Sequence, residues 1–420
     1  MRTEDMILFS TDDHVIEPAH LFEQHMPEKF RDQAPKIVKL PNGADRWIYQ
    51  DTETGTSGLG AVASWPRDEW NFDPVGYAEM RPGCYDVHQR VRDMDANGVL
   101  VSMNFPTFPG FAGTHFLSAP DKKISNMVIS AYNDWHIDEW CGTYPGRLFP
   151  LAIAPLWDPE LMVAEINRVA AKGCRAITLP ETPYGLGLPS FYTEYWDPVF
   201  KACCDNEVVV CLHIGTAFNI IQSPPDAPMD RLIILAPQLS ALTATDLLTA
   251  GVFRKFPTLR VALSEGGIGW IPFYLDRLDR HGWNHAWTRL DLGGGPSQTP
   301  TEVFRDHFLG CFITDPSALV NRDRIGIDIL AWECDFPHSD STWPNSPELL
   351  KAELDEAGLT DGEVAKITWE NAARFFRYDP FQHIAKSDAT VAALRARAGD
   401  VDTNETSKEE YKRRFASANA

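Results

Sequence analysis

The sequence predicts an α/β chain folded as a (β/α)8 TIM barrel, because short apolar segments alternate with longer amphipathic ones along its 420 residues. The short segments are rich in β-branched residues and lack a clean polar–apolar alternation, which is typical of strands buried on both faces of a parallel sheet. The expected strands are Ile7–Thr11, Val99–Phe105, Leu148–Ala154, Cys174–Leu179, Val208–Leu212, Leu259–Ser264, Phe308–Ile313 and Ile327–Trp332. So many strand–helix repeats favour a closed barrel over an open sheet.

The segments between these strands carry apolar residues at helical spacing. We expect helices at Lys122–Trp140, Pro159–Lys172, Leu239–Phe256 and Ile268–Arg280. Gly173 directly follows the second of these helices, and a C-terminal glycine commonly ends a helix.

Two regions depart from the alternation. Between Pro27 and Cys84 the chain is rich in glycine, proline and turn residues. This insertion after the first strand predicts a lid or small subdomain over the barrel mouth, and an inert surface excursion is the alternative. After about Phe381 the chain becomes polar and charged. We therefore assign residues 1–381 to the barrel and 382–420 to a C-terminal helical arm that is either disordered or wrapped around a neighbouring subunit.

The composition bears on which binding partners and which cellular compartment are expected. A formal net charge of −21 argues against nucleic acid and against anionic membranes. The N-terminus has no basic segment followed by an apolar run, and no stretch approaches the roughly 20 apolar residues of a membrane span, so neither a signal peptide nor a membrane helix is expected. The eight cysteines show no C-x-x-C spacing, and most lie in apolar segments. That pattern is typical of reduced, buried thiols and predicts a cytoplasmic protein.

Ionisable residues collect where the predicted strands end, which is where barrel enzymes carry their active sites. The first strand runs into Asp12-Asp13-His14, and the two-residue period of a strand places Asp12 and His14 on the same side. Further His, Asp and Glu residues follow the fourth, fifth, sixth and eighth strands. They are Glu181, His213, Glu265 and Asp335, with His338 three residues further on.

Each of these residues has a simpler explanation when it is taken singly. A lone histidine such as His213 at the end of an apolar strand is more often a core residue than a ligand. Asp12, Glu265 and Asp335 each suit the start of a helix, and Glu181 suits an ion pair with a basic neighbour. Four carboxylates at one barrel mouth repel one another unless a cation holds them together. The set as a whole therefore predicts a metal site.

Three segments resemble the amidohydrolase-related metalloenzymes, in particular the aminocarboxymuconate semialdehyde decarboxylase-like branch of the amidohydrolase superfamily. They are STDDHVIEP at residues 10–18, FPTLRVALSEGGIGWIPFYLDRLD at 256–279 and AWECDFPHSDSTWP at 331–344. The resemblance extends from about Ile7 to Phe381. It implies an amidohydrolase-like barrel in which the first-strand pair, a fifth-strand histidine and an eighth-strand aspartate bind metal. In this sequence those residues are Asp12, His14, His213 and Asp335.

Two positions depart from the pattern of the decarboxylases. Those enzymes commonly carry His-x-His on the first strand, where this chain has Asp12-Asp13-His14. They usually carry a catalytic histidine before the sixth-strand glycines, where this chain has Glu265. A buried glutamate with a raised pKa can also transfer protons. The chain is in addition similar to the subunits of 2-aminoisobutyrate hydroxylase, which implies a dinuclear metal centre that acts with oxygen.

The predicted ligand set combines four carboxylates with two imidazoles. It comprises Asp12, His14, Glu181, His213, Glu265 and Asp335. These ligand types suit one divalent Zn, Mn or Fe ion, or a pair of Fe or Mn ions. Just past the second strand, Phe105–Phe111 is predicted to line an apolar substrate pocket, and Trp270, Trp332 and Trp343 are further candidates.

We predict a metal-dependent hydrolase or non-oxidative decarboxylase that acts on a small organic molecule. The metal would polarise a substrate carboxylate or carbonyl, or lower the pKa of a bound water to about 7. Asp335, Glu265 and His338 are the predicted catalytic residues. The alternatives are a dinuclear Fe/Mn oxygenase that hydroxylates a small amine or amino acid, and a non-catalytic subunit that partners such an enzyme. We expect a homo-oligomer or a hetero-oligomer with a homologous subunit.

Overall fold

The computed structural model describes residues 1–217, 224, 226–288, 290–292 and 298–415. These residues belong to two compact units. The first unit comprises Met1–Leu151, Cys334–Leu349 and Asp379–Ala420, and the second comprises Ala152–Glu333 and Leu350–Tyr378.

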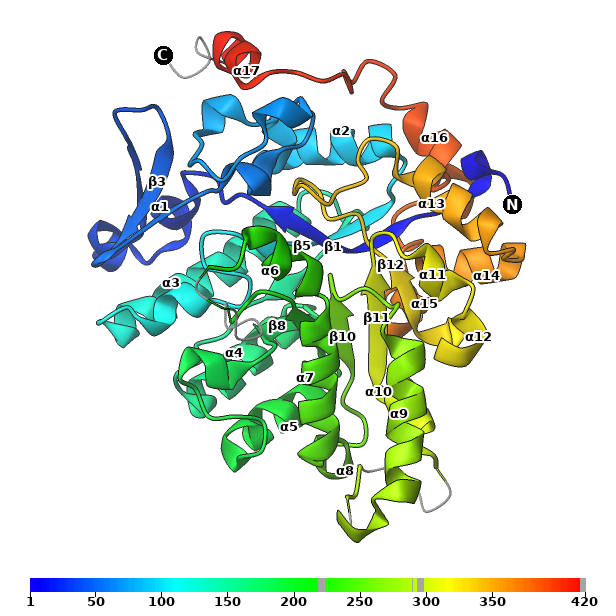
Figure 1. The fold of residues 1–420 in the computed structure, drawn as a ribbon. Coiled ribbons are helices and arrows are strands. Elements are labelled where there is room, and N and C mark those ends of the chain that lie inside the picture. The colour runs from blue at the N-terminus through cyan, green and yellow to red at the C-terminus, as the bar shows by residue number, and fades with distance from the viewer. Residues whose placement is uncertain (218–223, 225, 289, 293–297, 416–420) are drawn as a thin grey trace. The chain divides into compact units, whose positions relative to one another are not determined.

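The first unit contains a parallel sheet in which β5 lies between β1 and β6, and Figure 1 shows β1 beside β5. The strands are β1 (Phe9–Val15), β5 (Val101–Pro106) and β6 (Leu148–Phe149). All seven residues of β1 are buried, and three of them are ionisable. Burying an ionisable side chain without a partner costs free energy. Each of these three side chains therefore needs a hydrogen-bonding or charged partner in the folded protein.

The first strand is longer than the sequence predicted. The prediction ended the strand at Thr11, whereas β1 continues to Val15. The register of β1 against β5 shifts between Ser10 and Asp13, after which the two strands pair again. Asp12 and His14 therefore lie inside the strand and not beyond it. The apolar pattern missed this extension because the added residues are mostly polar.

The predicted insertion, residues 27–84, contains an antiparallel sheet of its own. Its strands are β2 (Lys36–Lys39), β3 (Asp45–Tyr49) and β4 (Thr52–Gly55), and the short helix α1 (Leu21–His25) precedes them. The rest of the insertion includes several short 3-10 turns, among them Gly58–Ala61 and Pro82–Cys84.

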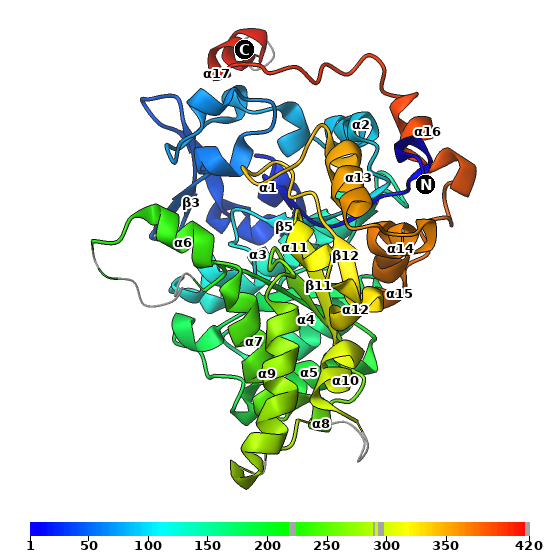
Figure 2. The same ribbon diagram turned by 45° about the vertical axis from the view of Figure 1, so that its right-hand side comes forward.

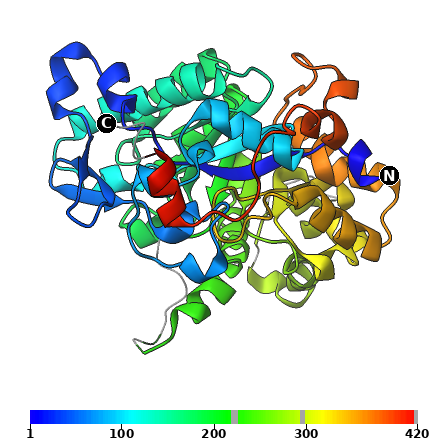
Figure 3. The same ribbon diagram turned by 90° about the horizontal axis from the view of Figure 1, so that it is seen from above.

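The C-terminal helix α17 (Lys408–Phe415) packs on this insertion within the first unit (Figures 1 and 3). The buried members of the shared apolar cluster are Ile16, Ala61, Val62, Trp65, Val75, Met80, Cys84 and Tyr411. The sequence predicted an arm that is disordered or wrapped around a neighbouring subunit. The described part of the arm, up to residue 415, contacts its own chain. Tyr411 and Phe415 lie one helical turn apart and both join the cluster.

Other helices of the first unit are α2 (Val87–Asn97), α3 (Lys122–Asp134) and α16 (Val391–Arg395). Asp86 and Asp121 cap the N-termini of α2 and α3 by accepting backbone hydrogen bonds. Between α16 and α17 the chain runs along α2 (Figure 2). There Arg92 of α2 donates to the Arg397 carbonyl at 2.7 Å and forms an ion pair with Asp400.

The second unit contains a parallel sheet of order β12-β11-β10-β9-β8, extended by the two-residue strand β7. The strands are β7 (Leu151–Ala152), β8 (Ala176–Pro180), β9 (Val209–His213), β10 (Val261–Ser264), β11 (Phe308–Phe312) and β12 (Leu330–Trp332). Every residue of β8 to β12 is buried, as predicted for strands that are covered on both faces.

Two predicted strands are broken up in the structure. The predicted strand Leu148–Ala154 is divided into β6 and β7 at Pro150, which has no N–H to donate to a neighbouring strand. In the predicted eighth strand Ile327–Ile329 forms a 3-10 turn, so that only Leu330–Trp332 is β structure.

The helices of the second unit follow its strands, and Figures 1 and 2 show α9 and α10 side by side next to β11. The helices are α4 (Pro159–Ala171), α5 (Asp197–Asp205), α6 (Met229–Leu235), α7 (Gln238–Thr249), α8 (Val252–Lys255), α9 (Ile271–Asn284), α10 (Pro300–His307), α11 (Pro316–Leu319), α12 (Arg322–Ile325), α14 (Asp361–Ala365) and α15 (Asn371–Phe375). Helix α13 (Ser346–Glu356) crosses the unit boundary in sequence. Within the described residues no single helix is long and apolar enough to span a membrane, although α6 and α7 meet the criterion together as a pair bent by 49°.

Candidate metal centre

Three of the predicted ligands lie together in the first unit. The Asp335 N–H donates to the Asp12 carbonyl at 2.9 Å, and the His14 N–H donates to the Phe336 carbonyl at 2.7 Å. These backbone bonds place the segment after Cys334 alongside β1. As a result His14 Nε2 lies 3.5 Å from an Asp12 carboxylate oxygen and 3.3 Å from an Asp335 carboxylate oxygen. All three side chains are completely buried.

His338 completes this group from the turn that follows Asp335. Its Nδ1 lies 3.1 Å from Asp335 Oδ1, and its ring stacks on the His14 ring with centroids 3.6 Å apart. Burial acts to raise the pKa of Asp335, but His338 and His14 outweigh it and hold the pKa below the ordinary value. The Asp335 carboxylate is therefore ionised between two imidazoles.

These residues fit a divalent cation. One ligand atom from each of His14, Asp335 and His338 lies within 4.8 Å of the other two. Ligand bonds of about 2.0–2.2 Å to one metal bring neighbouring donor atoms to about 3 Å from each other, which is close to the His14–Asp335 spacing. Buried carboxylates also require a positive partner. Mixed carboxylate and imidazole donors suit Zn, Mn or Fe.

A second group forms where three neighbouring strands of the second unit end in register. Pro180 of β8 and Ser264 of β10 both lie opposite His213 of β9. His213 Nδ1 donates to the Ile214 carbonyl at 2.6 Å, so the lone pair of the neutral ring is on the other nitrogen, Nε2. Glu265 Oε2 lies 3.1 Å from this Nε2. The contact is favourable with a proton between the two atoms, carried by His213 or by the Glu265 carboxyl, or with a metal cation at Nε2.

Glu265 is positioned by a residue that the sequence analysis missed. Its backbone has a φ of 55°, and its N–H donates to a carboxylate oxygen of the buried Glu333 at 3.0 Å. Glu333 directly follows the apolar strand β12, and this position at a strand end could have identified it from the sequence. The simpler explanation of Glu265 as a helix cap is wrong, because Asp315 accepts the N–H groups of Ile268 and Gly269 ahead of α9.

Glu181 is buried but has a different kind of partner. Both of its carboxylate oxygens accept from the Ala217 N–H, at 3.2 and 3.1 Å. The partner is thus a backbone amide, whereas the sequence had suggested an ion pair with a basic side chain. Burial raises the pKa of Glu181 to about 7, against the effect of the backbone hydrogen bonds. The structure thus brings Glu265 to His213 and fixes Glu181 separately on Ala217.

The predicted pocket segment Phe105–Phe111 is anchored by the buried Glu17. The two carboxylate oxygens of Glu17 accept from the N–H groups of Thr107 and Phe108, at 3.0 and 2.8 Å. Phe111 places its ring 4.9 Å from the His14 ring. The aromatic ring of Phe111 therefore packs against His14, one of the predicted ligands.

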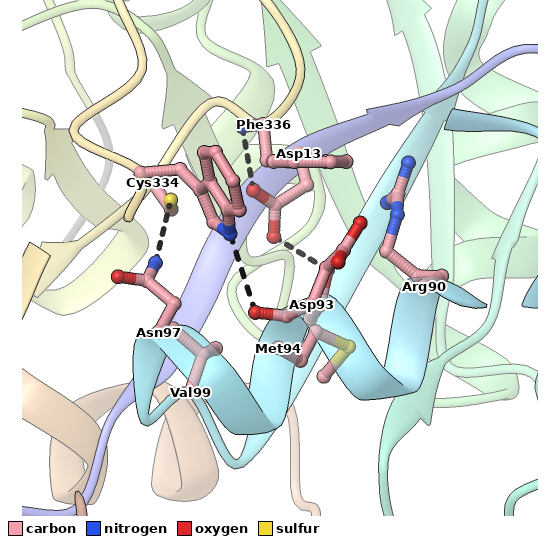
Figure 4. A pocket seen from close by; sticks show the side chains of 10 residues that line it. Asp13, Arg90, Asp93, Met94, Asn97, Val99, Cys334 and Phe336 are labelled. Carbon is pink, nitrogen blue, oxygen red and sulfur yellow. Dashed lines mark hydrogen bonds between the residues drawn. The ribbon is translucent and has the colours of Figure 1, made fainter. Parts of the chain in front are cut away.

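Asp13 is a further buried carboxylate that the sequence analysis did not single out. It lines a small cavity in the first unit, between α2 and the segment Cys334–Phe336 (Figure 4). Its oxygens accept from the Phe336 N–H at 2.8 Å and from the Ser102 hydroxyl at 2.5 Å. Burial raises the pKa of Asp13 to about 6, although Arg90, Ser102 and Phe336 act to lower it.

Proteins of similar sequence include decarboxylases. Gamma-resorcylate decarboxylase of Polaromonas sp. is 24% identical over 343 residues, which cover 74% of this chain and 95% of that protein. The 2-amino-3-carboxymuconate-6-semialdehyde decarboxylase of Dictyostelium discoideum is 23% identical over 320 residues, covering 74% of this chain and 82% of that protein.

Solved structures show the same fold. An amidohydrolase from Mycobacterium avium subsp. paratuberculosis matches with a TM-score of 0.66 at 19% identity, covering 88% of this chain and 99% of that chain. A 5-carboxyvanillate decarboxylase from Novosphingobium aromaticivorans, solved with bound manganese, matches with a TM-score of 0.58 at 19% identity, covering 90% and 99%. The predicted fold class is confirmed at the level of the α/β fold of amidohydrolase TIM-barrel structures. Residues 19–378 match the amidohydrolase family, and the chain belongs to that family.

Proposed function

We propose that this protein is a metal-dependent, non-oxidative decarboxylase of a small aromatic or other organic acid. The observation that carries the proposal is the group around the buried His14. Its Nε2 lies 3.5 Å from an Asp12 oxygen and 3.3 Å from an Asp335 oxygen, and donor atoms of His14, Asp335 and His338 lie close enough together for a divalent cation. The decarboxylase activity of the relatives favours this reaction over hydrolysis. Manganese in one related decarboxylase supports a divalent metal as the cofactor.

Asp12, His14 and Asp335 would hold the metal, and His213 remains a predicted further ligand. When bound, the metal supplies a positive charge that binds and polarises the substrate carboxylate. His338 directs one ring nitrogen at Asp335 and stacks on His14, so it helps to keep both side chains in place. Phe111 offers an aromatic face beside His14 for the body of the substrate.

Loss of carbon dioxide leaves the bonding electron pair on the substrate carbon, which then takes up one proton. Glu265 is our candidate for the proton donor. Its side chain is 19% exposed and lies against His213, at the position where the decarboxylases usually carry a histidine. A carboxyl group performs this step when its environment keeps it protonated at the working pH.

Carbon dioxide release from metal-loaded protein tests the proposal. The chain is stripped with a chelator, reloaded with Mn²⁺, Zn²⁺ or Fe²⁺, and incubated without oxygen with a panel of aromatic carboxylic acids that includes gamma-resorcylate and 5-carboxyvanillate. We expect carbon dioxide and decarboxylated product in equal amounts, only in the metal-loaded samples. The Asp335→Asn variant is the negative control. A metal-independent reaction, or hydrolysis without carbon dioxide, contradicts the proposal.

A dinuclear Fe/Mn oxygenase is our second candidate, favoured by the carboxylate of Glu265 beside His213. An additional carboxylate ligand suits a pair of Fe or Mn ions. About two such ions per chain and oxygen uptake linked to turnover of a small amine are expected for this alternative. Full activity under strictly anaerobic conditions excludes it.

A further inference from the structure

We infer that Asp13 is a positioning residue that holds Asp335 at its distance from the ligands of β1. The inference rests on the metal site proposed above. Asp13 lies between Asp12 and His14 in sequence, but successive side chains of a strand point to opposite faces. Figure 4 accordingly shows Asp13 among residues of α2 and the segment Cys334–Phe336.

The Asp13 carboxylate connects three segments of the first unit. One oxygen accepts from the Phe336 N–H at 2.8 Å, and Phe336 directly follows Asp335. The other oxygen accepts from the Ser102 hydroxyl of β5. Ser102 in turn accepts from the Asn104 side-chain amide at 2.9 Å, which stabilises its orientation. One side chain therefore joins β1, β5 and the segment that carries Asp335.

Phe336 is held at its amide, its carbonyl and its ring. Asp13 takes the N–H, the His14 N–H donates to the carbonyl at 2.7 Å, and the Arg90 guanidinium lies 4.6 Å from the ring centroid. Arg90 also donates to the His14 carbonyl at 2.5 Å. The backbone hydrogen bonds align β1 with the segment that carries Asp335 and Phe336. The Asp13 side chain adds a second attachment, because it binds the Phe336 N–H on the side of β1 that faces away from His14.

The 3.3 Å separation of His14 Nε2 and Asp335 Oδ1 therefore depends on Asp13. Without its carboxylate the Phe336 N–H loses its partner in a buried region, and the segment is free to shift by fractions of an ångström. Metal affinity is sensitive to shifts of that size, because ligand geometry must be held closely. A merely structural role would instead lower stability and leave metal binding unchanged.

The test compares Mn²⁺ affinity and Co²⁺ absorption spectra of the full chain after chelator treatment. Asp13→Ala is expected to bind Mn²⁺ about 10- to 100-fold more weakly, the range found when groups that orient metal ligands are removed. Its Co²⁺ spectrum is expected to change, because the ligand geometry changes. Asp13→Asn should retain most of the affinity, since its amide oxygen accepts from Phe336 and its amide N–H donates to Ser102.

Asp95→Ala is the matched control, because Asp95 is a buried carboxylate of the same unit that pairs with Arg147 at 2.7 Å. It should lower the melting temperature without altering Mn²⁺ affinity or the Co²⁺ spectrum. Wild-type protein that binds no Mn²⁺ refutes the proposed metal site itself. Wild-type binding with an unchanged affinity and spectrum in Asp13→Ala overturns only the role of Asp13.

Ser102→Ala keeps the inference testable if Asp13→Ala fails to fold. This change leaves the Asp13 carboxylate in place and removes its link to β5. We expect a weaker affinity and an altered Co²⁺ spectrum, in the same direction as for Asp13→Ala and of smaller size. An unchanged affinity and spectrum in this soluble variant overturns the inference.

Discussion

Asp335 and Glu265 both adopt the left-handed backbone region, with φ of 59° and 55°, although neither is glycine. Such a conformation costs about 1 kcal/mol or more, and it persists only where the surroundings hold it. For Asp335 the surroundings are the backbone bond to Asp12 and the two histidines. For Glu265 they are the Glu333 carboxylate and His213. Strain at two predicted ligands is consistent with selection for site geometry over stability.

Asp335→Asn is expected to weaken Mn²⁺ binding by more than about 100-fold, beyond the effect typical of residues that only support a ligand. The amide keeps the shape of the side chain but removes the negative charge that the cation requires. Isothermal titration of chelator-stripped protein measures the affinity. Asp315→Asn is the control, since this carboxylate accepts backbone N–H groups ahead of α9. Equal affinities in the two variants contradict the ligand assignment.

Glu17 is expected to make stability depend on pH. Burial raises its pKa from 4.5 to about 7, so between these values the folded state binds more protons than the unfolded state. The free energy of unfolding therefore falls as the pH rises from 4.5 to about 7, by about 3 kcal/mol from this group, at about 1.4 kcal/mol per pKa unit.

Urea unfolding of the wild type and of Glu17→Gln at pH 5 and pH 8 tests this expectation. The variant cannot ionise at this position, so its stability deficit relative to the wild type should be larger at pH 5 than at pH 8. The variant also loses one acceptor for Thr107 and Phe108 at both pH values, which leaves the difference between the two pH values unaffected. A deficit that does not change with pH contradicts the expected titration.

At the scale of elements, helix α17 stabilises the insertion. Tyr411 is 3% exposed within the apolar cluster and is hydrogen-bonded to Ser64 through its hydroxyl at 2.5 Å. The same hydroxyl lies 3.5 Å from the Arg81 guanidinium, which pairs with Asp93 and stacks on Trp343. The helix therefore contacts two residues of the insertion, Ser64 and Arg81, and Arg81 also packs on Trp343 in the segment after Asp335.

Tyr411→Ala is expected to lower the free energy of unfolding by about 3 kcal/mol, because it removes a buried ring from the cluster. Tyr411→Phe is the matched variant and should cost only about 1 kcal/mol, since it keeps the ring and removes one hydrogen bond. Thermal unfolding and limited proteolysis within residues 27–84 measure the effect. Equal stability of Tyr411→Ala and the wild type means that α17 contributes nothing to the insertion.

At the scale of the whole molecule, the chain passes repeatedly between its two units, and each unit carries part of the predicted ligand set. Asp12, His14 and Asp335 belong to the first unit. Glu181, His213 and Glu265 belong to the second. A metal that binds the folded chain and not the unfolded chain raises the stability of the fold by mass action.

Metal removal is therefore expected to lower the melting temperature. Free Mn²⁺ at about 100 times its dissociation constant adds about 2.7 kcal/mol to the free energy of unfolding. Scanning fluorimetry of chelator-treated protein, with and without Mn²⁺, measures the shift. Asp335→Asn should show no shift. A wild-type melting temperature that is indifferent to Mn²⁺ contradicts a metal site of useful affinity.

The α/β class and most of the strands were predictable from the sequence, because apolar runs with glycine- and proline-rich boundaries indicate buried strands. It also identified Asp12, His14, His213 and Asp335 as candidates, because ionisable residues that follow a short apolar run are visible in a single sequence. The contacts of Asp13 and Glu333 were not predictable from the sequence. Asp13 contacts Ser102, 89 residues away, and Glu333 contacts Glu265, 68 residues away. Such pairings depend on the register between strands and segments, which a local pattern of residues does not contain.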